Sequence, residues 1–112
     1  MRPETLYLTD ILEAADAIAR FLDGVEKQDF LNDELRQSAV LQKLIVIGEA
    51  ASRLPDSFQA QHPEVDWRDI VGFRNFAVHE YFSINWEIVW LTATQDVPPL
   101  REQVASMLAA TE

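Results

Sequence analysis

The sequence contains no cysteine and only three glycines among its 112 residues. Without cysteine the chain has no disulfide bond, no thiolate zinc site and no thiol nucleophile. Its apolar residues never form the run of roughly 18 that crosses a bilayer, and the first residues lack the basic-then-apolar order of a signal peptide. We therefore expect a cytoplasmic protein that does not engage a membrane.

Basic residues are scarce as well, with 9 Lys and Arg against 19 Asp and Glu and a net charge of −10. Broad, non-specific binding of nucleic acid requires clustered Lys and Arg, so the composition disfavours that class of protein. Four acidic residues fall on one side of the first predicted helix: Asp10, Glu13, Asp16 and Asp23. This side is either a solvated face or a docking surface for a basic partner.

The residues that are abundant favour helices, and no segment alternates with the period of two that strands require. The first predicted helix spans about Glu4–Glu26, and a second helix, capped by Asn32 or Asp33, ends near Leu54. A short helical turn follows at Pro55–Gln61. A third long helix is capped by Asp66 and turns Phe76 inward, and a last helix is capped by Asn85. Pro98 and Pro99 should kink or break the last segment before a packed tail, because proline lacks the backbone N–H and clashes with the preceding turn. We expect one all-α domain over residues 1–112, a four- to five-helix up-and-down bundle.

Two neighbouring residues in the second long segment carry structural information. Gly48 costs about 1 kcal/mol relative to alanine in a helix, which suggests that another helix crosses closely there. Glu49 ends the apolar run of residues 41–51, where an ionised carboxylate requires a partner. That partner is either Arg53, one turn along the helix, or Arg74, which Glu49 would then orient.

The stretch from Arg74 to Phe82 holds the side chains most capable of chemistry. Arg74 is a permanent cation that suits a phosphate, and a histidine such as His79 can act as base or acid near neutral pH. On an ideal helix the two side chains point about 140° apart. Either the helix ends near His79 and the chain turns the ring back, or both residues act with their counterparts from a second subunit.

Each of these residues also has a purely structural explanation, in which His79 merely ends a helix. The structural partners available are Asp69 and Glu80 for Arg74, and Phe82 and Trp86 for Tyr81. A metal cluster of His62, Glu64 and Asp66 lacks any recognised ligand spacing, so we expect no metal.

The segment Arg74–Tyr81 resembles the motif of the HEPN family, in which an arginine and a polar residue are followed by a short spacer and a histidine. A tyrosine two residues after the histidine marks the HepT-like subgroup. The flanking segments that resemble HepT proteins, in the same order, are Ile47–Ala51 with Leu54-Pro55, Trp67–Gly72, Ile88–Trp90 and Val97–Leu100. The resemblance covers essentially the whole chain; the residue after the histidine, often small or variable in the family, is Glu80 here.

This resemblance implies a HEPN/MNT toxin: a metal-independent endoribonuclease that needs no cofactor and acts on RNA such as tRNA or mRNA at the cleft of a homodimer. Its partner would be a minimal nucleotidyltransferase antitoxin, in a complex that could be a larger hetero-oligomer. The implied roles are catalysis for Arg74 and His79, support for Asn75 and Glu49, and AMPylation for Tyr81. The alternatives are a non-catalytic module that binds or presents itself to a nucleotidyltransferase, and a purely structural helical dimer.

Overall fold

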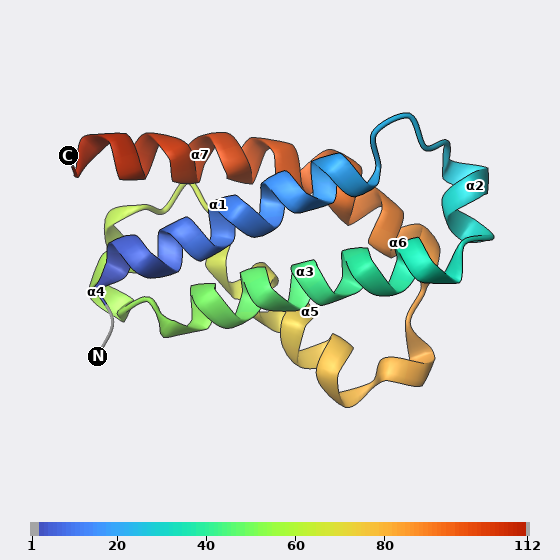
Figure 1. The fold of residues 1–112 in the computed structure, drawn as a ribbon. Coiled ribbons are helices and arrows are strands. Elements are labelled where there is room, and N and C mark those ends of the chain that lie inside the picture. Colours follow the sequence, from blue (N-terminus) through green and yellow to red (C-terminus); the bar gives the residue numbers. More distant parts are fainter. Residues whose placement is uncertain (1–2, 112) are drawn as a thin grey trace.

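The computed structural model describes residues 3–111 and shows an all-α bundle built on four long helices (Figure 1). These are α1 (Glu4–Phe21), α3 (Glu34–Arg53), α5 (Trp67–His79) and α7 (Val97–Ala110). Shorter elements connect them: α2 (Lys27–Leu31), α4 (Asp56–Gln61), the 3₁₀ turn η1 (Tyr81–Ser83), α6 (Trp86–Leu91) and the π-helical turn η2 (Thr92–Asp96). Successive long helices alternate in direction, which confirms the predicted up-and-down bundle. In the described part of the chain no helix is long and apolar enough to cross a membrane.

Helix α3 lies at the centre, with α1 and α5 packed against it, and α7 packs on α1. The core is formed by apolar side chains at helical spacing, and those with almost no exposed surface are Leu8, Ile11, Ile18, Val40, Leu41, Val89 and Val104. Phe30 of α2 is fully buried, and its ring lies 5.4 Å from that of Trp90 and 6.5 Å from that of Trp86. The short helix α2 therefore anchors α6 to the bundle.

Three predicted N-caps are present. The carboxylate of Asp33 accepts a hydrogen bond from the backbone N–H of Arg36 at 3.1 Å, and that of Asp66 accepts from Asp69 at 3.3 Å. The side chain of Asn85 accepts from the N–H groups of Glu87 and Ile88. Such bonds satisfy donors that the first turn leaves without a helical partner. They fix where α3, α5 and α6 begin.

The end of the first helix was predicted wrongly. Helix α1 stops at Phe21 rather than Glu26, and the chain turns at Gly24, whose φ of 73° is a left-handed conformation that glycine adopts without a steric penalty. Val25 fits the apolar stripe of the helix, so periodicity alone carried the prediction past the turn. The additional helix α2, which begins at Lys27, was not predicted.

Pro98 and Pro99 kink the last segment without breaking it, one of the two outcomes that were predicted. Both lie in the first turn of α7, and the residues four positions before them belong to the π-helical turn η2, where the proline rings would otherwise clash with the helical carbonyl groups. The irregularity lies just before them, in the π-helical turn η2, and the ribbon changes direction between α6 and α7 (Figure 1). The tail packs as predicted, because Val104 and Met107 are buried.

One member of the predicted acidic face has a structural role. The carboxylate of Asp16 accepts a hydrogen bond from Nε of Arg101 at 2.9 Å, which links α1 to α7. Glu13 and Asp23 are exposed, in agreement with a solvated face. The acidic side of α1 thus serves partly to hold the bundle together.

Candidate functional site

Helix α5 crosses α3 at Gly48, as the glycine predicted. A Cβ atom placed on Gly48 would overlap Cβ of Arg74, and would lie 2.9 Å from its Cγ and 3.1 Å from the carbonyl oxygen of Ile70. No side chain therefore fits at this position without moving α5. The close crossing brings the stem of Arg74 directly onto the surface of α3.

The guanidinium of Arg74 is held by two neighbours. Nη2 lies 2.7 Å from Oε2 of Glu49, and Nη1 donates a hydrogen bond of 2.9 Å to Oδ1 of Asn75. Nε is buried and has no acceptor among residues 3–111. Two bonds to a planar group fix its orientation as well as its position.

Glu49 joins both of the arginines that the sequence offered as alternatives. Its Oε1 accepts from Nε and Nη2 of Arg53 at 3.2 and 3.0 Å, while Oε2 bonds Arg74. Two cations around one carboxylate leave this group with a charge of +1, although the whole chain carries −10. The three side chains border a surface hollow of about 440 Å³ that Tyr7 of α1 also lines.

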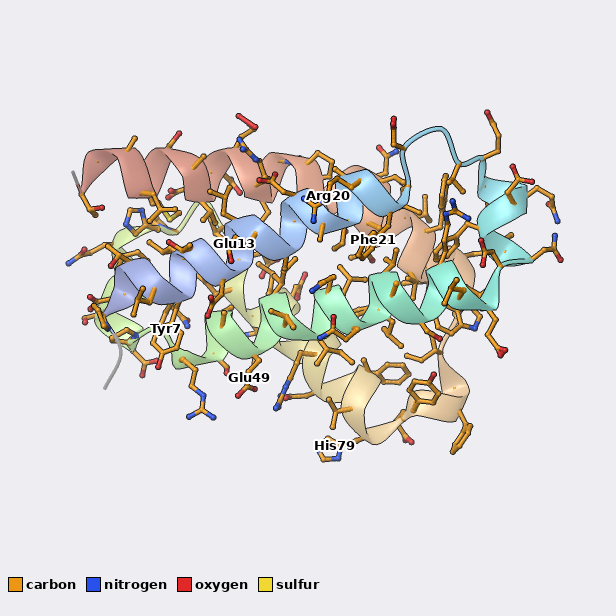
Figure 2. The ribbon with its side chains drawn as sticks, viewed as in Figure 1. Tyr7, Glu13, Arg20, Phe21, Glu49 and His79 are labelled. Carbon is orange, nitrogen blue, oxygen red and sulfur yellow. The ribbon has the colours of Figure 1, made fainter. Side chains whose placement is uncertain are left out.

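Helix α5 ends at His79, as predicted. Glu80 follows in a non-helical conformation, and its N–H donates to the carbonyl oxygen of Phe76 at 2.7 Å. The imidazole of His79 is exposed and points outward from the bundle (Figure 2), and its side chain has no hydrogen bond or ion pair within the described residues. Arg74 and His79 form no hydrogen bond with each other within the described residues.

Tyr81 and Phe82 form an exposed aromatic pair in η1, immediately after that histidine. Their rings meet edge to face with centroids 5.6 Å apart, while Tyr81 remains 48% exposed and Phe82 is 99% exposed. The ring contact of Trp86 is with Phe30 instead. The phenol of Tyr81 is therefore accessible to another molecule.

Phe76 does not point into the core, contrary to the prediction. It is 47% exposed, and six of the eight large apolar side chains that are exposed within residues 3–111 lie between Phe76 and Leu91. They are Phe76, Val78, Tyr81, Phe82, Ile88 and Leu91. Helical periodicity alone cannot separate a face that packs in the core from one left uncovered. The concentration around the motif is a feature that the sequence did not reveal.

The described part of the chain contains no group of three side chains suited to a metal ion. Nδ1 of His62 lies 3.4 Å from Oε2 of Glu64, but Asp66 caps α5 instead of joining them.

Comparison with known proteins shows the family. The sequence profile described as "Ribonuclease HepT-like" matches residues 11–107, which include Gly48, Glu49, Arg74, His79 and Tyr81. The chain belongs to the HepT-like ribonuclease family. It is 38% identical over 95 residues to a probable ribonuclease HepT of Thermococcus cleftensis, covering 85% of this chain and 86% of the relative.

Two further HepT-like relatives match over most of their length. A candidate RNase of Caldanaerobacter subterraneus subsp. tengcongensis is 34% identical over 108 residues, 96% of each chain. Another from Methanocaldococcus jannaschii is 34% identical over 98 residues, 88% of this chain and 90% of the relative. No solved structure matches the chain. Membership of this HepT-like family supports ribonuclease activity.

Proposed function

We propose that this HepT-like protein is a metal-independent endoribonuclease whose active site contains Arg74 and His79 from each of two copies. The observation that supports the proposal most strongly is the contrast between these residues. Arg74 is fixed by Glu49 and Asn75, whereas the imidazole of His79, at the end of the same helix, is exposed and unpartnered within residues 3–111. A held cation and a free titratable group are the two components that phosphodiester cleavage requires.

The reaction proceeds without a metal by attack of the ribose 2′-oxygen on the adjacent phosphorus. One imidazole accepts the proton of the 2′-hydroxyl as the bond from O2′ to phosphorus forms. The bond from phosphorus to O5′ breaks, and a protonated imidazole gives its proton to the leaving oxygen. The products are a 2′,3′-cyclic phosphate and a 5′-hydroxyl end. The guanidinium of Arg74 stabilises the charge that builds on the phosphoryl oxygens.

Two histidines normally divide the acid and base roles, but this stretch of α5 supplies one. A symmetric dimer provides the second imidazole and a second arginine. The uncovered apolar side chains on α5 and α6, which are Phe76, Val78, Ile88 and Leu91, supply surface for such a contact. The dimer also accommodates the angle of about 140° between the Arg74 and His79 side chains on an ideal helix.

The proposed biological role is that of a toxin whose antitoxin is a minimal nucleotidyltransferase. The phenolic oxygen of Tyr81 attacks the α-phosphorus of ATP, the bond to the β,γ-phosphates breaks, pyrophosphate leaves and the phenol proton is released. The half-exposed position of Tyr81 permits this transfer. The attached AMP brings a negative charge and bulk close to His79, which blocks the RNA site.

Purified protein free of any partner tests the nuclease directly. Total RNA incubated with wild-type protein in EDTA should be cut to products with 2′,3′-cyclic phosphate ends. Arg74→Ala and His79→Ala should each be slower by about 100-fold or more, because a lost charge-stabilising donor or proton-transfer group has that effect. Equal cleavage by all three proteins would identify a contaminant and reject the site.

The modification is tested by intact mass. After incubation with the nucleotidyltransferase, ATP and Mg²⁺, the mass should rise by whole AMP units, and Tyr81→Phe should show no gain. Phe82→Tyr is a control that adds a neighbouring phenol without removing the target. An undiminished gain in Tyr81→Phe would reject Tyr81 as the acceptor.

A second candidate is a non-catalytic module that binds a nucleotidyltransferase. The uncovered apolar side chains around the motif favour this interpretation too, since they suit any protein partner. A partner-free protein that cuts no RNA but still forms a stable complex with the nucleotidyltransferase would establish the module and exclude the nuclease.

A further inference from the structure

Phe82 is the most exposed large apolar side chain in the described part of the chain. Only about 1% of its surface is covered, whereas the next most exposed, Leu35, retains 81%. Phe82 follows His79 by three residues, a span of at most about 11 Å of extended chain. It therefore lies within one or two nucleotides of a phosphate held at His79.

The charge of the molecule limits how RNA can be held. The chain carries 19 acidic against 9 basic residues, so the counterion release that usually dominates binding to nucleic acid is weak here. Glu80 adds a carboxylate between His79 and the aromatic pair. The free energy of binding a single strand must therefore come largely from contacts that do not depend on charge.

Aromatic rings provide such contacts, because unpaired bases stack on them. The planes of the Tyr81 and Phe82 rings meet nearly at right angles, with an interplanar angle of 89°. Because Phe82 is 99% exposed, the faces of its ring are open to a base. Leu35, on the first turn of α3, is also exposed but has no aromatic face on which a base could stack.

We propose that Phe82 is a stacking platform for the base next to the cleaved phosphate of a single-stranded RNA. The inference rests on the proposed nuclease function and adds to it the residue that holds the substrate. Because the contact is through an aromatic face, it favours purines, which stack more strongly than pyrimidines. Binding then depends less on salt than in a basic RNA-binding protein.

Binding is measured by fluorescence anisotropy with fluorescein-labelled 12-mers of adenosine and of uridine. The protein carries His79→Ala, so the RNA stays intact. The adenosine strand should bind more tightly. Phe82→Ala and Phe82→Leu should each weaken its binding by about 5- to 150-fold, the loss expected for one stacked base, while Phe82→Trp should retain it. Leu35→Ala, the exposed apolar control, should bind as the unmodified protein does.

The leucine variant separates stacking from a merely apolar contact. If the Phe82→Leu variant binds RNA as tightly as the protein that retains Phe82, or if all variants bind alike, the stacking platform is rejected. Sedimentation of each variant identifies a contact between copies: loss of both the dimer and RNA binding in Phe82→Leu would assign the ring to that contact instead. Since binding is measured without cleavage, stacking that survives in a protein with no nuclease activity would reject the nuclease and retain the platform.

Discussion

At the scale of single residues, Glu49 matters for orientation more than for stability. Its carboxylate and the Arg74 side chain are 38% and 30% exposed, and ion pairs with such exposure contribute about 0–1 kcal/mol. A second pair with Arg53 is more exposed still. Glu49 and Asn75 together fix the direction of the Arg74 guanidinium.

Glu49→Gln should therefore lower kcat without unfolding the protein. A displacement of the guanidinium by about 1 Å costs up to about 100-fold in rate. KM should not rise, because removing the carboxylate makes the hollow beside Arg74 more positive by one charge. The measurements are steady-state cleavage of a labelled RNA and the thermal midpoint. Arg53→Gln, which leaves the bond between Glu49 and Arg74 in place, should lower kcat less. A higher KM with unchanged kcat in Glu49→Gln would contradict the orienting role of Glu49.

At the scale of elements, the crossing of α3 and α5 decides where the site lies. Gly48 allows the two helices to approach until the stem of Arg74 rests on α3, which brings Glu49 within bonding distance. Gly72, on the other face of α5, has no neighbouring group within 4 Å of the position that a Cβ atom would take. The two glycines thus form a matched pair, one required by packing and one not.

Alanine at these two positions should have opposite effects on the free energy of unfolding. Gly72→Ala should stabilise the protein by about 0.5–1 kcal/mol through helix propensity. Gly48→Ala gains the same propensity but overpacks the crossing, which costs about 1–3 kcal/mol, so the protein should be less stable by up to about 2 kcal/mol. Urea denaturation measures both. Equal stabilisation by the two substitutions would show that α5 does not depend on the close approach.

The start of α3 should make stability depend on pH. Arg36 lowers the pKa of Asp33 below its ordinary value of 3.8, first through a side-chain hydrogen bond and then through its backbone N–H. A carboxyl group with a lowered folded-state pKa stabilises the fold above its unfolded pKa, and this contribution is lost as pH falls through the folded-state value.

Asp33→Asn keeps a good N-cap and removes the titrating group. The variant should be slightly less stable than wild type at about pH 6, and the difference should shrink towards about pH 3. Urea midpoints across this range provide the measurement, with Asp29→Asn as a control for the loss of one negative charge. A difference that stays constant with pH would contradict the assignment.

The sequence predicted elements well where the signal was local. Asp33, Asp66 and Asn85 cap helices through their own side chains, and Gly48 marks a close crossing because only glycine fits there. Pro98 and Pro99 predicted that the last segment would be interrupted but not how, because a kink with a π-helical turn and a complete break carry the same proline signal. The end of α1 was missed because Val25 continued the apolar stripe beyond Gly24.

The candidate site was predictable only in part. Arg74, Asn75 and Glu49 meet as the sequence suggested, because one close helix crossing brings them together. The sequence spacing could not predict that Glu49 bonds both arginines at once, because this depends on how α5 is rotated against α3. The direction of the His79 ring was likewise left open between two geometries, and the structure points it outward.

At the scale of the whole molecule, the proposed active site requires two copies of the chain. Large apolar side chains that are uncovered in one copy concentrate from Phe76 to Leu91, around the histidine that lacks a partner within residues 3–111. A two-fold axis near the end of α5 would bring two such histidines together and cover the apolar side chains of α5 and α6, leaving Tyr81 and Phe82 at the edge of the contact. The acid and the base of the reaction would then belong to different chains.

Dilution with an inactive variant tests this claim most directly. Wild-type protein is unfolded in urea and refolded with an about ninefold excess of His79→Ala, or of Leu35→Ala as the control. RNA cleavage in EDTA is then measured and divided by the number of chains that retain His79. Because only about one wild-type chain in ten then pairs with another, activity should fall about tenfold with His79→Ala and stay unchanged with Leu35→Ala. Activity that is undiminished by excess His79→Ala would contradict a site that needs both histidines.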